Sequence, residues 1–325
     1  MSARLRIAAA GPTVSLQDRG RYGGRRYGVS LSGPMDDASH ALALALAGAH
    51  ADAPAFEFGP GGMSVEAKGA PLRLAVAGPG AGGVLTRKGL RSVLPAPFVA
   101  VIEPGDGLAV RPGADGSWGT LAVAGLDAGE RVLGSHATNL RTGLGPPRPD
   151  AGSTYPCPAA APEPARLFAE PLPRPEALVV RLLAAPQTHL FDAASREALV
   201  SREYTITRQR DRMGGRIEGP PLRARSHDIV SDALVKGAIQ VPGDGQPIVQ
   251  TADAAPTGGY PKIAVIARAD LPLLVQARAP SPVCFRWIEI EEARAASLAL
   301  QRAIEGVAPR RRAPLDPDFL KAFSI

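Results

Sequence analysis

Residues 236–262 read KGAIQVPGDGQPIVQTADAAPTGGYPK, and this stretch predicts a β-rich fold. Two dense turn signals, PGDG at 242–245 and PTGG at 256–259, surround the apolar run 247–249. Gly and Pro clusters around a short apolar run are typical of a strand between tight turns. Glycine also lets the backbone approach a ligand or another strand closely. The stretch fits a β core with tight hairpins and no site, and it equally fits a binding site built from turns.

The overall composition is that of a soluble globular protein rich in turns. Hydrophobic residues make up 45% and charged residues 21% of the 325 positions, which is ordinary for this class. The chain is long enough to bury the core of one large domain or of two halves. Aromatic residues are scarce at 5%, whereas 36 glycines and 33 prolines are present. This balance favours β architecture over a helical bundle.

Charge and cysteine usage exclude several classes of protein. The net charge of +6 is spread along the chain, and no basic patch is interleaved with aromatic residues. We therefore expect no nucleic-acid partner. No apolar run has the length of a membrane span, and residues 5–10 are too few for a signal peptide. Cys157 and Cys284 cannot make a disulfide framework, so we expect a cytoplasmic protein.

The hydrophobic pattern predicts many short strands and few helices. Pro34, Asp36 and Asp37 indicate the start of a buried helix with its body at 38–47 and Gly48 as its end. A second helix is predicted at 290–307, and a turn at 270–272. Strands are expected at 5–10, 55–58, 72–77, 98–102, 108–110, 120–124, 178–183, 204–207, 247–249, 263–266 and 282–288.

A proline-rich stretch suggests how the chain is divided. Ten prolines fall between Pro146 and Pro175. Such a composition is typical of a linker or a long surface excursion. We therefore expect an N-terminal β-rich module at 1–145, a linker or excursion at 146–175, and a C-terminal β-rich module with a terminal helix at 176–325.

Several familiar motifs are absent or occur in the wrong context. Residues 78–83 fit the spacing of a dinucleotide-binding loop, but no helical pattern follows them. The chain has neither a Walker loop nor a G-x-S-x-G elbow. Its five histidines are dispersed, so no metal site is expected. The pair Ser135–His136 is interpreted as part of a turn.

Polar side chains within Gly-rich turns are the remaining candidates for chemistry. Arginine can hold a carboxylate with two hydrogen bonds, and glutamine offers an oriented donor and acceptor to an amide. A lactam, a urea or a carboxybiotin ureido group needs such partners. The four arginines within 19–26 suit an anionic ligand or partner, or alternatively a solvated hairpin. A structural hydrogen bond within a turn is the competing interpretation for each of these side chains.

Three motifs in a fixed order resemble a known family. GAIQVP at 237–242, DGQPI at 244–248 and TGGYPK at 257–262 are similar to the carboxyltransferase-like (allophanate hydrolase subunit 2-like) family. This family includes the C subunit of 5-oxoprolinase, the regulator KipA and the related part of urea carboxylase. The similarity extends to DRMG at 211–214, VSLQDRGR at 14–21 and GVSLSGPMD at 28–36. It therefore covers most of the chain.

The resemblance implies a fold, partners and three alternative activities. It implies two cyclophilin-like β-barrel modules related by pseudo-symmetry, in a mainly β protein with a few helices. It also implies a KipI-like B subunit and a third subunit as partners, with ATP used by the complex to open 5-oxoproline to glutamate. The alternatives are transfer of a carboxyl group to urea by a biotin-dependent enzyme, and KipA-like regulatory binding without turnover.

We assign the candidate residues from the polar positions of these motifs. Catalytic roles are expected for Asp18, Arg212, Tyr260 and Lys262. A small amide substrate is expected to contact Gln17, Arg21, Ser32, Asp36, Gln240, Gln246, Asp253 and Thr257. We expect Arg212→Ala and Tyr260→Phe to reduce the activity of the reconstituted complex without unfolding the protein.

The chain departs from the family pattern within this same stretch. The family usually carries DRQTTGGYP, whereas residues 253–261 read DAAPTGGYP. Ala254 and Ala255 thus replace an arginine and a glutamine, and Pro256 replaces a threonine. Loss of one charged contact to a substrate costs roughly 2–4 kcal/mol. The departures are compatible with a changed substrate or with lost catalysis.

Overall fold

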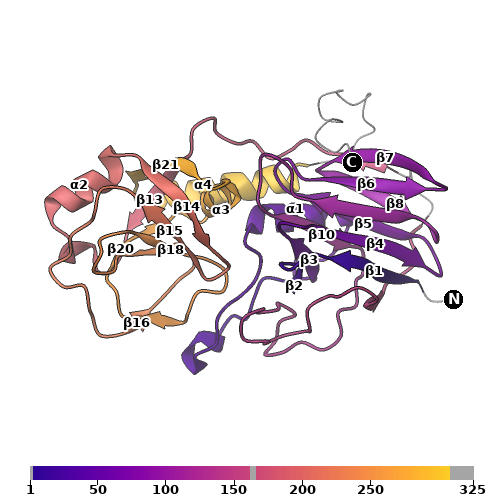
Figure 1. Ribbon diagram of the computed structural model, residues 1–325, viewed down its shortest axis with the longest axis horizontal. Helices are drawn as coiled ribbons and strands as arrows, with labels where there is room; N and C mark the ends of the chain where they lie inside the picture. The colour runs from indigo at the N-terminus through magenta and orange to yellow at the C-terminus, as the bar shows by residue number, and fades with distance from the viewer. Residues whose placement is uncertain (1–2, 162–165, 308–325) are drawn as a thin grey trace. The chain divides into compact units, whose positions relative to one another are not determined.

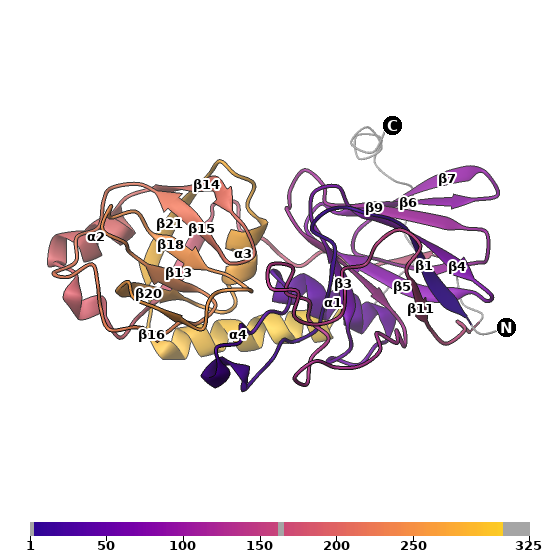
Figure 2. The same cartoon turned by 60° about the horizontal axis from the view of Figure 1, so that its bottom comes forward.

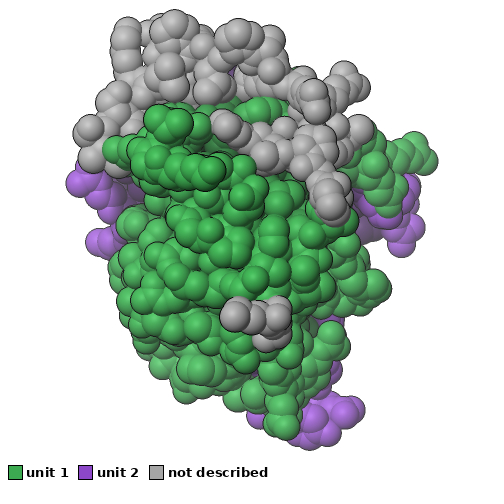
Figure 3. All heavy atoms as spheres, turned by 90° about the vertical axis from the view of Figure 1, so that its right-hand side faces the viewer, with its two compact units in different colours: residues 1–20, 36–172, 302–325 green, residues 21–35, 173–301 purple. Residues whose placement is uncertain are grey.

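The computed structural model describes residues 3–161 and 166–307, which form two compact units. Unit 1 comprises Met1–Gly20, Asp36–Leu172 and Arg302–Ile325, and unit 2 comprises Arg21–Met35 and Pro173–Gln301 (Figure 1, Figure 3). The described residues hold 21 strands and four α-helices, which confirms the predicted mainly β fold. The units differ from the contiguous modules expected from sequence, because residues 21–35 make their contacts within unit 2.

Unit 1 is built from two six-stranded sheets in which every pair of strands is antiparallel. The first sheet has the order β11 (Thr154–Pro156), β1 (Arg4–Ala10), β4 (Met63–Lys68), β9 (Gly107–Arg111), β6 (Gly82–Arg87) and β7 (Leu90–Pro95). The second has the order β12 (Arg166–Phe168), β8 (Phe98–Ile102), β5 (Leu72–Ala77), β10 (Gly119–Val123), β3 (Ala55–Phe58) and β2 (Ser15–Gln17).

The alternation of side chains along β5 explains why the second sheet is covered on both faces. Leu72, Leu74 and Val76 join the core that the two sheets share. Ala75 and Ala77 point the other way and pack with the apolar side chains of α1 (Asp37–Ala47). Because both faces are buried, the strand reads in the sequence as a nearly continuous apolar run.

Helix α1 forms as the sequence predicts. The N-cap Asp36 accepts hydrogen bonds from the N–H groups of Ala38 and Ser39, both at 2.9 Å. Gly48 ends the helix with φ 73°, in the left-handed region that favours glycine. The capping geometry accounts for both ends, and the apolar body accounts for its burial against β5 and β10.

The proline-rich stretch contains two short strands of unit 1. β11 pairs with β1, and β12 pairs with β8, so each extends an edge of a sheet. The dinucleotide-like glycine loop at 78–83 leads into the strand β6 and not into a helix. The glycine loop therefore lacks the helix N-terminus on which a dinucleotide-binding loop places its phosphates.

Unit 2 contains a closed seven-stranded barrel (Figure 1, Figure 2). Its strands β13 and β21 pair in parallel, and the other neighbours pair antiparallel. Around the barrel the order is β13 (Val179–Ala184), β20 (Lys262–Ile266), β17 (Ala238–Gln240), β18 (Ile248–Gln250), β15 (Gly214–Glu218), β14 (Tyr204–Arg210) and β21 (Ser281–Trp287). The pair β16 (Asp232–Ala233) and β19 (Thr257–Gly258) forms a separate small sheet.

The remaining helices differ in how well the sequence predicts them. α4 (Ile290–Glu305) confirms the predicted terminal helix, whereas α2 (Ala193–Ser201) was not predicted. The predicted turn at 270–272 is wrong, because α3 (Leu271–Gln276) begins there. Pro272 lies in the first turn of α3, where a missing N–H does no harm. Two short 3₁₀ helices complete the fold, η1 (Gly24–Tyr27) and η2 (Thr188–Leu190).

Residues 21–35 are held in unit 2 by hydrogen bonds to its loops. Lys236 Nζ donates to the carbonyl of Pro34 at 2.7 Å, and Arg25 donates to the carbonyl of Leu234. The segment closes on itself as well, since the N–H of Arg21 donates to the carbonyl of Leu31 at 2.7 Å. A piece of the N-terminal sequence therefore completes the C-terminal unit.

Candidate functional site

A buried ion pair joins three distant segments of unit 2. Arg212, in the turn between β14 and β15, donates from Nε to Asp253 Oδ2 at 2.8 Å and from Nη2 to Oδ1 at 3.3 Å. Nη2 also donates to the carbonyl of Gly33 at 2.6 Å. Both side chains are more than nine-tenths buried. Arg212 is therefore engaged with protein groups, which gives it the role of a residue that positions residues 32–35.

Ser32 lies in the segment that this arginine holds. Its φ of 57° is in the left-handed region, which a serine adopts at a cost of roughly 1–3 kcal/mol. Its hydroxyl is buried and has no hydrogen-bond partner among the residues that the structure describes. Arg21, from the start of the same segment, is also buried. The Ser32 hydroxyl is therefore a candidate contact for a ligand.

A second ion pair connects the barrel to the small sheet. Lys262, at the start of β20, donates from Nζ to Asp232 Oδ2 at 2.6 Å and to the carbonyl of Ala233 at 3.1 Å. The lysine side chain is 3% exposed, whereas the aspartate is 44% exposed. Gln187 donates to the same carboxylate at 2.9 Å. These donors fix β16, and through its pairing they fix β19.

The Asp232 carboxylate should titrate at unusually low pH. Hydrogen bonds from Lys262, Gln187 and the N–H of Ala233 lower its pKa from 3.8 to about 2. A lowered pKa contributes stability above the ordinary value, and this contribution disappears as the pH falls from about 4 towards 2. We expect the carboxyl carbon of Asp232 to show an NMR midpoint near 2, which moves towards 3.8 in Lys262→Met. A native midpoint at 3.8 would contradict the ion pair.

Two glutamine side chains on neighbouring strands of the barrel, β17 and β18, lie next to the TGGYP motif. Gln250 donates to Gln240 Oε1 at 3.1 Å, and Gln240 donates to the carbonyl of Tyr260 at 3.2 Å. A Cβ at Gly258 would lie 2.5 Å from Gln240 Nε2, so the glycine leaves room for the present position of this side chain. The Tyr260 ring is 41% exposed. The arrangement orients one amide and presents one phenol.

The other predicted residues of unit 2 have different surroundings. Gln246 accepts from the N–H of Gly219 at 3.0 Å and donates to its carbonyl at 3.2 Å, which ties two turns together. Thr257 lies in β19 with an exposed side chain. Gln246 therefore serves the structure, and Thr257 is placed on the same small sheet that Lys262 fixes.

In unit 1, Asp18 forms the centre of a buried polar cluster. Ser135 Oγ donates to Asp18 Oδ1 at 2.5 Å, and the N–H of His136 donates to Oδ2 at 2.7 Å. His136 Nδ1 lies 3.9 Å from that oxygen, while Nε2 lies 2.9 Å from the carbonyl of Gly129. All three side chains are buried. The cluster brings an acid, a hydroxyl and an imidazole together, although the hydroxyl faces the acid and not the imidazole.

Gln17 and Asp36 have structural partners in unit 1. Gln17 Nε2 donates to Ser15 Oγ at 2.8 Å and to the carbonyl of Thr138 at 2.9 Å, and its side chain is fully buried. Asp36 caps α1, and its second oxygen accepts from Ser39 Oγ at 2.6 Å. Both side chains therefore have structural hydrogen bonds, which support the competing interpretation that they hold the fold together and do not contact a substrate.

The structure thus collects most of the predicted residues in one unit. Arg212, Tyr260 and Lys262 belong to unit 2, and Asp18 belongs to unit 1. Sequence reasoning missed Asp232, Gln187 and Gln250 in unit 2, and it interpreted Ser135 and His136 of unit 1 as a turn. Asp232 gave no signal because its partner Lys262 lies 30 positions away. The pairing of Ser135 with Asp18 spans 117 positions.

Two other kinds of feature are absent from the described part of the chain. Within residues 3–161 and 166–307, no three His, Cys, Asp or Glu side chains are grouped so that they could hold a metal ion. None of the helices in these same ranges is long and apolar enough to cross a membrane.

Comparison with known proteins assigns the family. Residues 27–287 match the family model of the carboxyltransferase domain, subdomain A and B. The chain belongs to this carboxyltransferase domain family. The matched range contains the whole unit 2 site, from Ser32 to Lys262, and it begins after Gln17, Asp18 and Arg21.

Three members and neighbours define the similarity further. The chain is 33% identical over 313 residues to the C subunit of Escherichia coli 5-oxoprolinase, covering 94% of this chain and 98% of that protein. It matches the crystal structure of TTHA0988 with a TM-score of 0.77 and 34% identity, over 88% of this chain. The chain spans about half, 56%, of the length of TTHA0988. A urea amidolyase structure from K. lactis has a TM-score of 0.81 at 22% identity, over 96% of this chain and 21% of that one. This last likeness concerns the fold of a carboxyltransferase domain.

Proposed function

We propose that this protein is the component of an ATP-dependent 5-oxoprolinase that corresponds to its C subunit. The observation that carries the proposal is the similarity to the Escherichia coli C subunit along nearly the full length of both chains. The partners in the proposal are a KipI-like B subunit and a third subunit, and the compartment is the cytoplasm. ATP is used by the assembled complex, and this chain carries no Walker loop.

The chemistry of unit 2 supports a small cyclic amide as the substrate. The Gln250–Gln240 pair is an oriented amide network, and the Ser32 hydroxyl is buried without a partner in the described chain. Tyr260, whose carbonyl accepts a hydrogen bond from Gln240, offers an exposed phenol. In the proposal these groups hold the lactam of 5-oxoproline, while Arg212 and Lys262 fix the loops that carry them.

Transfer of a carboxyl group is the second candidate function. The family assignment supports it, since residues 27–287 match the carboxyltransferase domain model. This function requires a biotin carboxylase and a biotin carrier as partners. A KipA-like binding role without turnover is favoured by Ala254 and Ala255, which replace the polar residues usual in the motif.

The test is to purify the native complex by affinity and to assay it. We expect a KipI-like protein to co-purify, and the complex to release glutamate from 5-oxoproline only when ATP is added. Recovery of a biotin carboxylase, with carboxylation of urea, would replace the proposal by the second function. Stable partner binding with no turnover of either substrate would leave the regulatory role.

A further inference from the structure

Unit 2 contains a pocket of about 440 Å³ that shares no residue with the site around the TGGYP motif. It opens where the parallel strands β13 and β21 begin to pair. Val179 is in register with Cys284, and the N–H of Cys284 donates to the carbonyl of Leu178 at 3.0 Å. On the N-terminal side of Leu178 the chain diverges from β21, so the space between this segment and β21 is left open. The volume is within the range of small-molecule sites.

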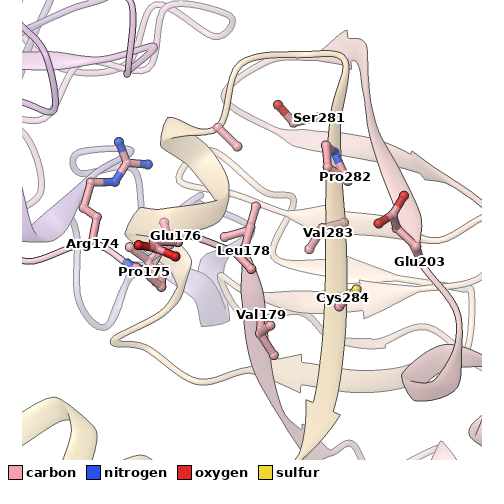
Figure 4. Close-up of a pocket in the computed structure, with 13 residues that line it drawn as sticks. Arg174, Pro175, Glu176, Leu178, Val179, Glu203, Ser281, Pro282, Val283 and Cys284 are labelled. Carbon is pink, nitrogen blue, oxygen red and sulfur yellow. The ribbon is translucent and has the colours of Figure 1, made fainter.

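The floor of the pocket is apolar. Leu178 and Val283 lie side by side (Figure 4). Val283 is 1% exposed, so the accessible aliphatic surface on this side comes from Leu178. Leu273 and Ala277 of the α3 region add further aliphatic surface. An aliphatic chain of a ligand would be removed from water here, which favours binding in proportion to its buried area.

The charged side chains at the rim are two glutamates and one arginine, Arg174. Glu176 and Glu203 lie on opposite sides of the apolar floor (Figure 4). Within the described chain, neither carboxylate has a hydrogen bond or an ion pair. The donors of the lining are occupied: Ser281 Oγ donates to the carbonyl of Arg278, and Arg174 already has an interaction of its own. Because the two carboxylates outnumber the single arginine, the rim favours a ligand that donates hydrogen bonds or carries positive charge.

We propose that this pocket binds a small organic cation, a short aliphatic chain that ends in an ammonium or guanidinium group. The chain lies on Leu178, Leu273 and Ala277, and the charged end lies at the rim near Glu176 or Glu203. The inference is independent of the 5-oxoprolinase proposal, since it uses no residue of that site. Loss of 5-oxoprolinase activity and loss of cation binding are therefore separate observations.

The two cysteines of the chain make binding measurable. Cys284 lines the pocket and is partly exposed, whereas Cys157 is buried in unit 1. Burial raises the pKa of the Cys157 thiol to about 11, so at pH 8 it is almost entirely the unreactive thiol. An alkylating reagent should therefore modify Cys284 first, and a pocket ligand should slow that reaction.

The experiment measures alkylation of the full chain by iodoacetamide at pH 8, with intact mass and peptide mapping. Hexylamine is the probe, and hexanol and hexanoate at the same concentration are the matched controls. We expect saturable protection of Cys284 by hexylamine, with at least threefold weaker protection by either control. Equal protection by hexanol, or no protection by hexylamine, would overturn the proposal. A lysine-containing peptide that protects better than hexylamine would also overturn it, in favour of a protein partner.

Two variants test the carboxylates. Glu176→Gln and Glu203→Gln remove exposed charges without changing side-chain size, and at least one should raise the hexylamine concentration for half-protection about threefold. Glu130→Gln removes an exposed charge in unit 1 and should leave it unchanged. Protection that is the same in all three variants would show that charge does not contribute, and the proposed ligand class would be wrong.

Discussion

Arg212→Ala is expected to lower the free energy of unfolding of unit 2 by about 3–5 kcal/mol. The substitution leaves the Asp253 carboxylate buried without its partner, and it removes the hydrogen bond to the carbonyl of Gly33. An uncompensated buried charge is far more costly than the pair itself. The structure thus changes the expectation from sequence that Arg212→Ala leaves the fold intact.

The position of the two tryptophans allows this measurement in one unit. Trp287 lies in β21 of unit 2, and Trp118 belongs to unit 1. In a Trp118→Phe background, fluorescence during urea unfolding therefore reports on the barrel. Arg216→Ala is the matched control, because Arg216 pairs with Asp244 at the surface, and it should cost below about 1 kcal/mol.

A double substitution separates burial of charge from loss of packing. Arg212→Met with Asp253→Leu replaces the pair by apolar side chains, and it should recover much of the loss seen in Arg212→Ala. If the single variant were as stable as Arg216→Ala, the buried ion pair would not hold the segment 32–35. If the double variant were less stable than the single one, the charges themselves would be required.

The fold could be predicted from the sequence wherever local signals suffice. The run at 55–58 coincides with β3, and the run at 72–77 coincides with β5, because each apolar strand is bounded by Gly or Pro. The helix that ends at Gly48 could be predicted equally well, because its cap residues and its apolar body indicate the same bounds. The turn prediction at 270–272 failed because Pro272 is compatible with both a turn and the first turn of a helix.

Other features depend on contacts that no local pattern encodes. Residues 21–35 belong to unit 2 through individual hydrogen bonds such as that from Lys236 to the carbonyl of Pro34, 202 positions apart. Two of the candidate residues from the sequence motifs, Gln240 and Tyr260, are in contact in the structure. Asp232 was missed because an isolated aspartate near a serine gives no sign of the lysine that it will meet. The four arginines near 19–26 are likewise engaged within the protein. Arg19 pairs with Asp52, Arg25 donates to the carbonyl of Leu234, Arg26 lies over the ring of Tyr27, and Arg21 has an interaction of its own.

Lys262→Met is expected to lower kcat of the reconstituted complex by about 100-fold while the barrel remains folded. Lys262 ties β16 to β20, and β16 pairs with β19, which ends two residues before Tyr260. Methionine suits the buried position of the stem, and the half-exposed Asp232 can be hydrated once its partner is gone. Stability should therefore change by less than about 1 kcal/mol, whereas a displacement of about 1 Å near the reacting groups is enough for the loss of rate.

The partner residue distinguishes positioning from direct contact with the substrate. If Lys262 positions the small sheet, Asp232→Ala breaks the same connection and should lower kcat to a similar extent, with KM less affected. If Lys262 instead touches the substrate, the loss should be confined to Lys262→Met. Lys68→Met is the control, because this lysine also pairs with a carboxylate, Glu66 at 2.8 Å, but lies in unit 1 and is half-exposed. Full activity in both Lys262→Met and Asp232→Ala would exclude the small sheet from the site. In that case the TGGYP motif would remain part of the site only if Tyr260→Phe reduced activity by itself.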